Sequence, residues 1–146
     1  MSILAHNRIK LGAHAKDKAD AIRQCGALLV SSGCVSAEYV DGMLAREASM
    51  STSLNVGVAI PHGMYDNRDH IKHTGISVLQ LVEGVPWENE DDIVRLVIGI
   101  AASSDEHVGV LSSLADVIDD EDQLNALFVT DDPDVVMRTL SAARSE

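Results

Sequence analysis

Two of the six histidines in this 146-residue sequence stand where the chain can present an imidazole to a reactant. His62 follows a stretch of alternating apolar residues and is flanked by Pro61 and Gly63, so a short, stiff segment holds it. His107 lies in the first turn of a predicted helix that follows a second apolar stretch. If the two stretches are neighbouring strands, both imidazoles meet at one edge of the sheet.

The chemistry that suits such a pair is nucleophilic. A neutral imidazole can attack a phosphorus or carbonyl centre near pH 7, and a hydrogen bond to its other ring nitrogen fixes which nitrogen attacks. His107, near the positive end of a helix, would stay uncharged and donate a hydrogen bond to an anion, while Arg46 would supply a fixed positive charge. The alternative interpretation is that His62 and His107 are surface residues that share no task.

A metal site is the competing hypothesis. His70 and His73 are three residues apart, Asp66 and Asp69 lie nearby, and His62 would complete a zinc set. The sequence has no His-Glu-x-x-His helix, however, and solvated loop histidines explain this segment more simply. We therefore expect neither a metal nor another cofactor.

Composition excludes several classes of partner. Lys and Arg total 11 against 23 Asp and Glu, which gives a formal net charge of −12. Nucleic acid and anionic membrane surfaces need a concentrated basic patch, and none is written here. No apolar run reaches the ~20 residues of a membrane-spanning helix, and the N-terminus lacks a signal-peptide pattern. We expect a soluble cytoplasmic protein in which the two cysteines, Cys25 and Cys34, are small buried hydrophobes.

Two helices are expected before the stretch that carries His62. The first begins after Asp17, which can cap it, and ends at Gly33. The second begins at Ser36, a plausible N-cap, and places Arg46 near its C-terminal end.

The hydrophobic period then changes from about 3.6 to 2. Residues 54–60 alternate between apolar and small or polar side chains and predict a strand that Pro61 ends, with Gly63 free to adopt an unusual backbone conformation. Further strands are predicted over residues 3–11, 75–82 and 93–100. The last of these is almost continuously apolar, as expected of a central strand covered on both faces.

Helices complete the chain. Ser103 and Glu106 have capping-box spacing at the start of one, and shorter helices are expected over residues 122–128 and from Pro133. Residues 1–146 thus predict one α/β domain, a sandwich with a central mixed β-sheet flanked by helices.

Three segments carry a resemblance to a known family. They are Gly57-Val-Ala-Ile-Pro-His-Gly63, Arg95-Leu-Val-Ile-Gly-Ile-Ala-Ala102, and Asp105-Glu-His-Val108 with Leu111-Ser-Ser-Leu114. Together they resemble the IIA domain of the mannitol/fructose class of the bacterial sugar phosphotransferase system. The similarity runs from about Leu4 to Leu140 and is strongest to the mannitol branch.

The resemblance implies a phosphoryl carrier. Its phosphorylated histidine corresponds to His62, attacking through Nε2, its second histidine to His107, and its arginine to Arg46. The family implies no metal ion. The resemblance thus implies the same three residues, His62, His107 and Arg46, that their positions in the chain had already indicated.

The resemblance also implies partners. Such domains take the phosphoryl group from the phosphocarrier protein HPr and pass it to a cysteine of a IIB component, here expected on a separate chain (IIB or IICB) for uptake of a mannitol-type sugar. Met50, Leu54 and Met64 are candidates for partner contact, with acidic residues around them. The alternative is a regulatory EIIA-like module whose phosphorylation state another protein reads.

Overall fold

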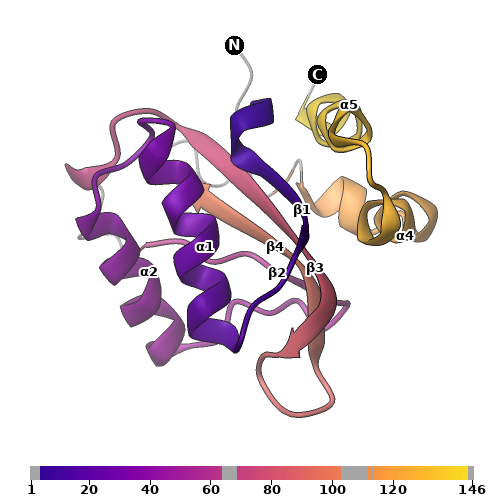
Figure 1. Ribbon diagram of the computed structural model, residues 1–146, viewed down its shortest axis with the longest axis horizontal. Helices are drawn as coiled ribbons and strands as arrows, with labels where there is room; N and C mark the ends of the chain where they lie inside the picture. The colour runs from indigo at the N-terminus through magenta and orange to yellow at the C-terminus, as the bar shows by residue number, and fades with distance from the viewer. Residues whose placement is uncertain (1–3, 64–68, 103–111, 113, 145–146) are drawn as a thin grey trace.

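The computed structural model describes residues 4–63, 69–102, 112 and 114–144, which contain nine named elements (Figure 1). In chain order they are η1 (His6–Arg8), β1 (Ile9–Ala13), α1 (Lys18–Ser31), α2 (Glu38–Ser49), β2 (Val58–Ala59), β3 (Gly75–Pro86), β4 (Ile93–Ala101), α4 (Glu121–Val129) and α5 (Pro133–Arg144). Residues 114–118 are also helical.

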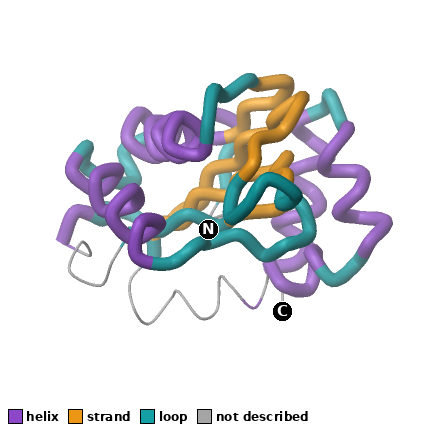
Figure 2. Tube along the Cα trace, turned by 90° about the horizontal axis from the view of Figure 1, so that it is seen from below, coloured by secondary structure: helices purple, strands orange, loops and turns teal. Residues whose placement is uncertain are grey.

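The strands form one mixed sheet in the order β1-β3-β4-β2. β3 and β4 are antiparallel, whereas β1 runs parallel to β3 and β2 parallel to β4. Helices α1 and α2 cover one face of the sheet, and α4 and α5 lie on the other side (Figures 1 and 2). The predicted α/β architecture, a mixed sheet flanked by helices, is confirmed.

The core consists of two apolar layers, one on each face of the sheet. From β4, Val94, Val97 and Ala101 pack toward α1 and α2, and Leu96, Ile98 and Ile100 pack toward the other layer. All six are at most 1% exposed. The prediction that this strand is covered on both faces is therefore confirmed.

The first helix begins and ends as its sequence predicts, but the second does not begin at Ser36. Asp17 caps α1 by accepting the Asp20 N–H at 2.8 Å, and Gly33 follows the helix with φ +85°. Before α2, Ser36 donates its N–H to the His70 carbonyl, and its hydroxyl lies 3.1 Å from Nδ1 of His70. Because this neighbouring segment engages Ser36, Ala37 is the N-cap and contributes no side-chain hydrogen bond.

The predicted strand over residues 54–60 is mostly a tight turn. Only Val58–Ala59 pair as a strand, and the chain reverses before them through positive φ angles at Asn55 (63°) and Gly57 (86°). Leu54 N donates to Val58 O at 2.9 Å across this turn. Residues 54–60 do alternate between apolar and small or polar side chains, but the first half of this stretch lies on the exposed arm of a hairpin.

The edges of the other strands also differ from the prediction. The first strand begins at Ile9 because a 3₁₀ turn, η1, precedes it. β3 continues to Pro86 through an irregularity between Gln80 and Val85, where Gly84 has φ +74°. The expected capping box at Ser103 and Glu106 lies outside the described residues.

Both cysteines belong to the core, as predicted. Cys25 is fully buried in α1, and burial raises the pKa of its thiol to about 12. Cys34 is 3% exposed. The Cys25 thiol therefore stays protonated near pH 7 and serves as a small packing group rather than a nucleophile.

Candidate functional site

His62 is held against the central strand of the sheet. After β2, the chain continues beside β4: Ile100 N donates to Pro61 O at 2.9 Å, and His62 itself is a parallel bridge partner of Ile100. Pro61 therefore ends the regular strand without releasing the chain from the sheet. The half-buried side chain of His62 projects from a backbone that β4 holds in place.

One hydrogen bond defines the orientation of the His62 ring. Nδ1 lies 2.9 Å from the carbonyl oxygen of Ile60. A carbonyl oxygen can only accept, so Nδ1 carries the hydrogen. In the neutral ring the lone pair is therefore on Nε2, which makes Nε2 the nucleophilic atom.

Tyr39 of α2 braces the backbone on both sides of this histidine, a role that sequence reasoning missed. Its hydroxyl donates to Ile100 O at 2.8 Å and accepts from Gly63 N at 2.9 Å. Burial raises the pKa of this phenol above its usual value, so the group remains a donor over the physiological range. No motif marks Tyr39, because its apolar helical spacing is that of any core residue.

The packing of Tyr39 gives a different reason for glycine at position 63 from the one predicted. The φ of Gly63 is not among the positive values of the structure. A Cβ at this position would approach Cε1 of Tyr39 to 2.6 Å, so the close approach of the ring, rather than backbone freedom, requires glycine.

Arg46 lies in the last turn of α2, at the start of the segment that leads to His62. It is half-buried, and its Nη1 donates to Met50 O at 2.7 Å. His107 lies outside the described residues, so its expected meeting with His62 stays a prediction. The strand that precedes it, β4, ends at Ala101, directly after the bridge partner of His62.

Comparison with known families decides what kind of domain carries this arrangement. The family model for "Phosphoenolpyruvate-dependent sugar phosphotransferase system, EIIA 2" matches residues 2–143. The chain belongs to this family. Its predicted resemblance to the IIA class is therefore confirmed.

Individual relatives agree with the family. This EIIA chain is 47% identical over 137 residues to a multiphosphoryl transfer protein of Xanthomonas campestris pv. campestris, covering 94% of this chain and 16% of that protein. It is 42% identical over 142 residues to the mannitol-specific EIICBA component of Pasteurella multocida, covering 96% of this chain and 23% of that protein. The chain thus spans less than a quarter of either relative.

A solved structure supports the mannitol branch. Mannitol enzyme IIA of Escherichia coli, in its complex with phosphorylated enzyme IIB, superposes with a TM-score of 0.91. The two chains are 41% identical, and the match covers 97% of this chain and 99% of the other. The predicted likeness to mannitol-type IIA domains is confirmed.

In this EIIA domain an apolar hollow of about 410 Å³ opens beside the segment that carries His62. Leu54, Val56 and Ile60 contribute one wall, and Leu114, Ala115, Ile118 and Asp119 contribute the other. Leu54 is 38% exposed, and Met50, also expected at a partner contact, is 67% exposed. Met64, the third residue expected there, lies outside the described residues.

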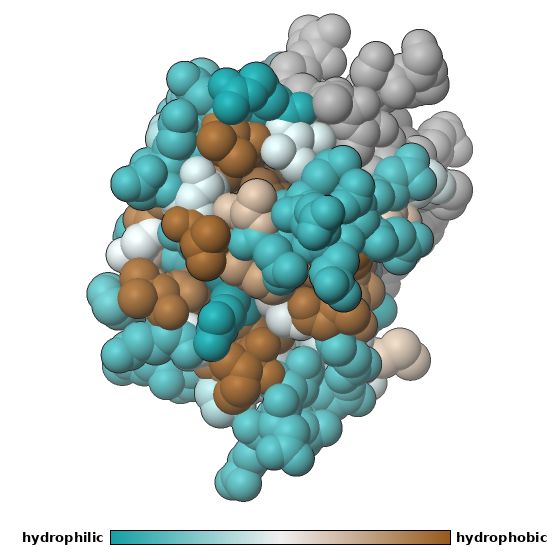
Figure 3. All heavy atoms as spheres, turned by 90° about the vertical axis from the view of Figure 1, so that its right-hand side faces the viewer, coloured by the Kyte–Doolittle hydropathy of each residue, from teal (hydrophilic) through white to brown (hydrophobic). Residues whose placement is uncertain are grey.

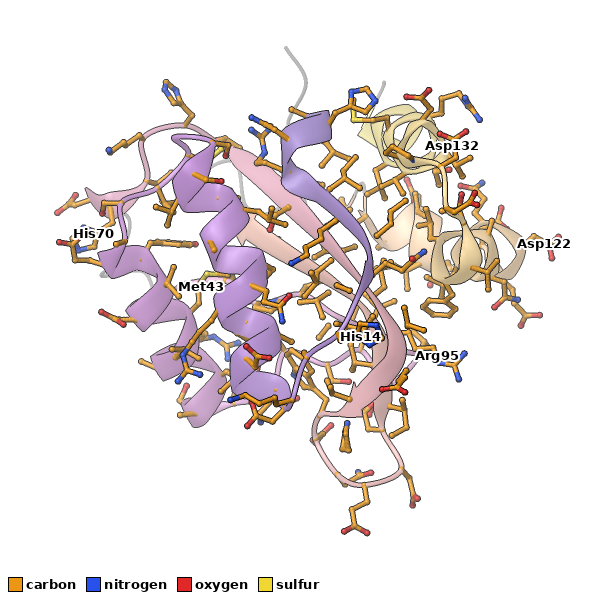
Figure 4. All side chains as sticks on the ribbon, viewed as in Figure 1. His14, Met43, His70, Arg95, Asp122 and Asp132 are labelled. Carbon is orange, nitrogen blue, oxygen red and sulfur yellow. The ribbon has the colours of Figure 1, made fainter. Side chains whose placement is uncertain are left out.

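The zinc hypothesis finds no support in the described part of the EIIA chain. His70 contacts the Ser36 hydroxyl and lies at the outer edge of the molecule beside α2 (Figure 4). Across residues 4–63, 69–102, 112 and 114–144, no group of three His, Cys, Asp or Glu side chains is arranged to hold a metal ion. Asp66 lies outside these ranges.

Among the helices that the structure describes, none combines the length and the apolar character that a bilayer crossing requires.

Proposed function

We propose that His62 is the phosphoryl acceptor of this EIIA domain and that the domain relays a phosphoryl group from HPr to a IIB component. The observation that carries the proposal is the hydrogen bond from Nδ1 of His62 to Ile60 O, which leaves the lone pair on Nε2. Family membership supplies the reaction class, and the ring geometry supplies the attacking atom.

The transfer balances without a metal ion or a proton carrier. As Nε2 of His62 bonds to phosphorus, the bond from phosphorus to the donor's histidine nitrogen breaks, and that imidazole leaves with the electron pair. The proton on Nδ1 stays in place throughout, and Ile60 O faces the positive charge that the ring acquires. In the next step a IIB cysteine thiolate attacks phosphorus, and His62 leaves with its lone pair restored.

Positioning and charge balance are the main tasks of the protein in such a transfer. The phosphoryl group passes through a loose transition state whose negative charge is spread over three equatorial oxygens. We assign His107 and Arg46 to these oxygens, on the strength of the family resemblance and of the position of Arg46 at the end of α2. The relay then needs a partner that approaches closely enough to align two nucleophiles with phosphorus.

The hollow beside Ile60 suits that approach. Its apolar lining is bordered by Asp119, and a neighbouring depression that shares Asp119 adds Glu121. A partner with an apolar centre and basic surroundings fits this surface. On the face that carries α4 and α5, apolar residues form separate patches between hydrophilic ones (Figure 3).

The wider proposal follows from the same assignment. Residues 1–146 act as one EIIA domain in the cytoplasm, and its IIB acceptor serves a mannitol-type sugar. The mannitol-specific EIICBA relative and the mannitol enzyme IIA structure support this choice of sugar class.

The test is phosphoenolpyruvate-dependent labelling in the presence of enzyme I and HPr. We expect the wild type to take up one phosphoryl group in an acid-labile, base-stable form, and His62→Ala to take up none. His70→Ala is the matched control and should label normally. A label that survives His62→Ala would refute the assignment of the acceptor.

A chase with candidate IIB proteins then tests the second step. Transfer of the label to a IIB cysteine supports the transport relay. If His62 is labelled but no mannitol-type or fructose-type IIB accepts the group, the relay is wrong and the regulatory module takes its place.

A further inference from the structure

The site contains a buried acid that the proposed transfer does not use. Glu47 lies in the last turn of α2, directly after Arg46, and is only 5% exposed. A carboxylate is rarely buried unless donors surround it, because leaving water costs it several kcal/mol. The burial of the Glu47 carboxylate beside this site therefore calls for a functional reason as well as a structural one.

Donors from three parts of the chain converge on this carboxylate. Thr52 gives both its backbone N–H, at 3.2 and 3.1 Å from the two oxygens, and its hydroxyl. The indole N–H of Trp87 donates at 3.1 Å, and the ammonium of Lys18 lies 3.7 Å away. Glu47 thus ties the end of α2 to α1, to the end of β3 and to the segment that leads to His62.

A chain of hydrogen bonds leads from Thr52 to the imidazole of His62. The Thr52 carbonyl accepts the Ile60 N–H at 3.1 Å, and the Ile60 carbonyl accepts Nδ1–H of His62 at 2.9 Å. Thr52 and Ile60 are the facing ends of the hairpin that turns at Asn55 and Gly57. The carbonyl that selects the tautomer of His62 is therefore placed by a residue that Glu47 holds.

We propose that Glu47 is a positioning residue for His62, acting through Thr52 and Ile60 to aim the carbonyl that keeps the hydrogen on Nδ1 and the lone pair on Nε2. The proposal rests on the proposed role of His62 as acceptor. It assigns Glu47 no contact with the phosphoryl group. Its effect is on the orientation and tautomer of the nucleophile, and hence on the rate of transfer.

Four variants separate positioning from simple stabilisation. Glu47→Gln keeps the shape of the side chain but replaces one acceptor oxygen by a donor, which faces the Thr52 and Trp87 donors unfavourably. Thr52→Val removes only the hydroxyl donor and keeps the β-branched shape, and Thr52→Ser restores the hydroxyl. Trp87→Phe is the matched control, because it removes a hydrogen bond to the same carboxylate from a residue outside the path to His62.

The decisive measurement is the tautomer of His62 in the unphosphorylated protein, read from the ¹⁵N chemical shifts of the imidazole nitrogens, with His62→Gln for assignment. We expect the wild type and Thr52→Ser to hold the hydrogen on Nδ1. Glu47→Gln and Thr52→Val should increase the fraction with the hydrogen on Nε2. Their single-turnover rates of labelling at saturating phospho-HPr should fall about tenfold, as for the loss of an orienting partner.

Trp87→Phe should lower the free energy of unfolding while leaving tautomer and rate within twofold of the wild type. Should Glu47→Gln fail to fold, Thr52→Val and Thr52→Ser decide the question alone. The proposal is overturned if Thr52→Val keeps the wild-type tautomer and rate, or if all variants change in proportion to their loss of stability. Because the tautomer is read without a phosphoryl donor, an unlabelled wild type would refute the acceptor role of His62 separately.

Discussion

At the residue scale, the proposed function divides the site into a group that would form the bond and groups that would balance its charge. The Nδ1–H of His62 donates to Ile60 O, so in the neutral ring the lone pair lies on Nε2, the atom proposed as nucleophile. Arg46 is tied by its Nη1 to Met50 O, which orders the guanidinium near the end of α2. An ordered cation loses less entropy when it meets an anion, which suits the transition-state role proposed for Arg46.

This division predicts different kinetics for the charge-balancing residues than for the acceptor. Arg46→Ala and His107→Ala should each slow labelling by on the order of a hundredfold, as for the loss of one preorganised donor. Both should still reach one phosphoryl group per chain at long times, because Nε2 of His62 remains. Quenched-flow labelling measures the rates, and circular dichroism verifies the fold. Complete loss of labelling in folded His107→Ala would instead identify His107 as the acceptor.

At the scale of elements, the segment that carries His62 is positioned by hydrogen bonds to α2 and β4. The Tyr39 hydroxyl joins α2 to Ile100 of β4 and to Gly63, immediately after His62. The ring packs where a Gly63 Cβ would stand. Two elements that are far apart in sequence thus fix the exit of the histidine from the sheet.

Tyr39→Phe tests that brace. The change leaves Gly63 N–H and Ile100 O without this partner, so we expect the free energy of unfolding to fall by about 2 kcal/mol. The rate of labelling should also fall severalfold, about as much with saturating as with limiting phospho-HPr, since the defect is in the orientation of His62. Urea denaturation measures the free energy of unfolding, and labelling reactions quenched at successive times measure the rate. A stability loss with an unchanged rate would mean that Tyr39 supports the fold alone.

The sequence allowed the positions of the site to be predicted better than the contacts that hold it. Alternation and apolar runs place His62 after one strand and beside another, because sheet periodicity depends on local composition. The tight turn at Asn55 and Gly57 escaped prediction, since its residues continue the apolar alternation while their backbone reverses. Tyr39 escaped because Gly63 lies 24 residues away from it, and no local pattern encodes such a contact. Glu47 escaped although Thr52 is only five residues away, because the indole that completes its burial, Trp87, lies 40 residues away.

Helix ends show the same distinction. The Asp17 cap is a contact within three residues and was predictable. The Ser36 cap failed because His70, 34 residues away, accepts its N–H and contacts its hydroxyl. Local propensity is overridden wherever a tertiary partner competes for the same atoms.

At the scale of the whole molecule, net charge and shape determine how a partner arrives. A chain with a net charge of −12 attracts a basic partner over distances set by the Debye length, about 10 Å at 0.1 M salt and about 3 Å at 1 M. In the proposed relay, the apolar hollow beside Ile60 would then provide contact at short range. Steering therefore affects the rate of encounter, and the chemistry after docking depends on charge much less.

Neutralising an acid at the hollow should accordingly reduce encounter and leave the chemical step intact. We expect Asp119→Asn to lower kcat/KM for transfer from phospho-HPr about threefold at low salt, with little change in kcat. The matched control is Asp41→Asn, an equal change of charge at an exposed position of α2 on the opposite face of the sheet. At 1 M salt, where screening removes steering, both variants and the wild type should converge. If Asp41→Asn reduces kcat/KM as much as Asp119→Asn does, the partner responds to total charge and the hollow is not where it docks.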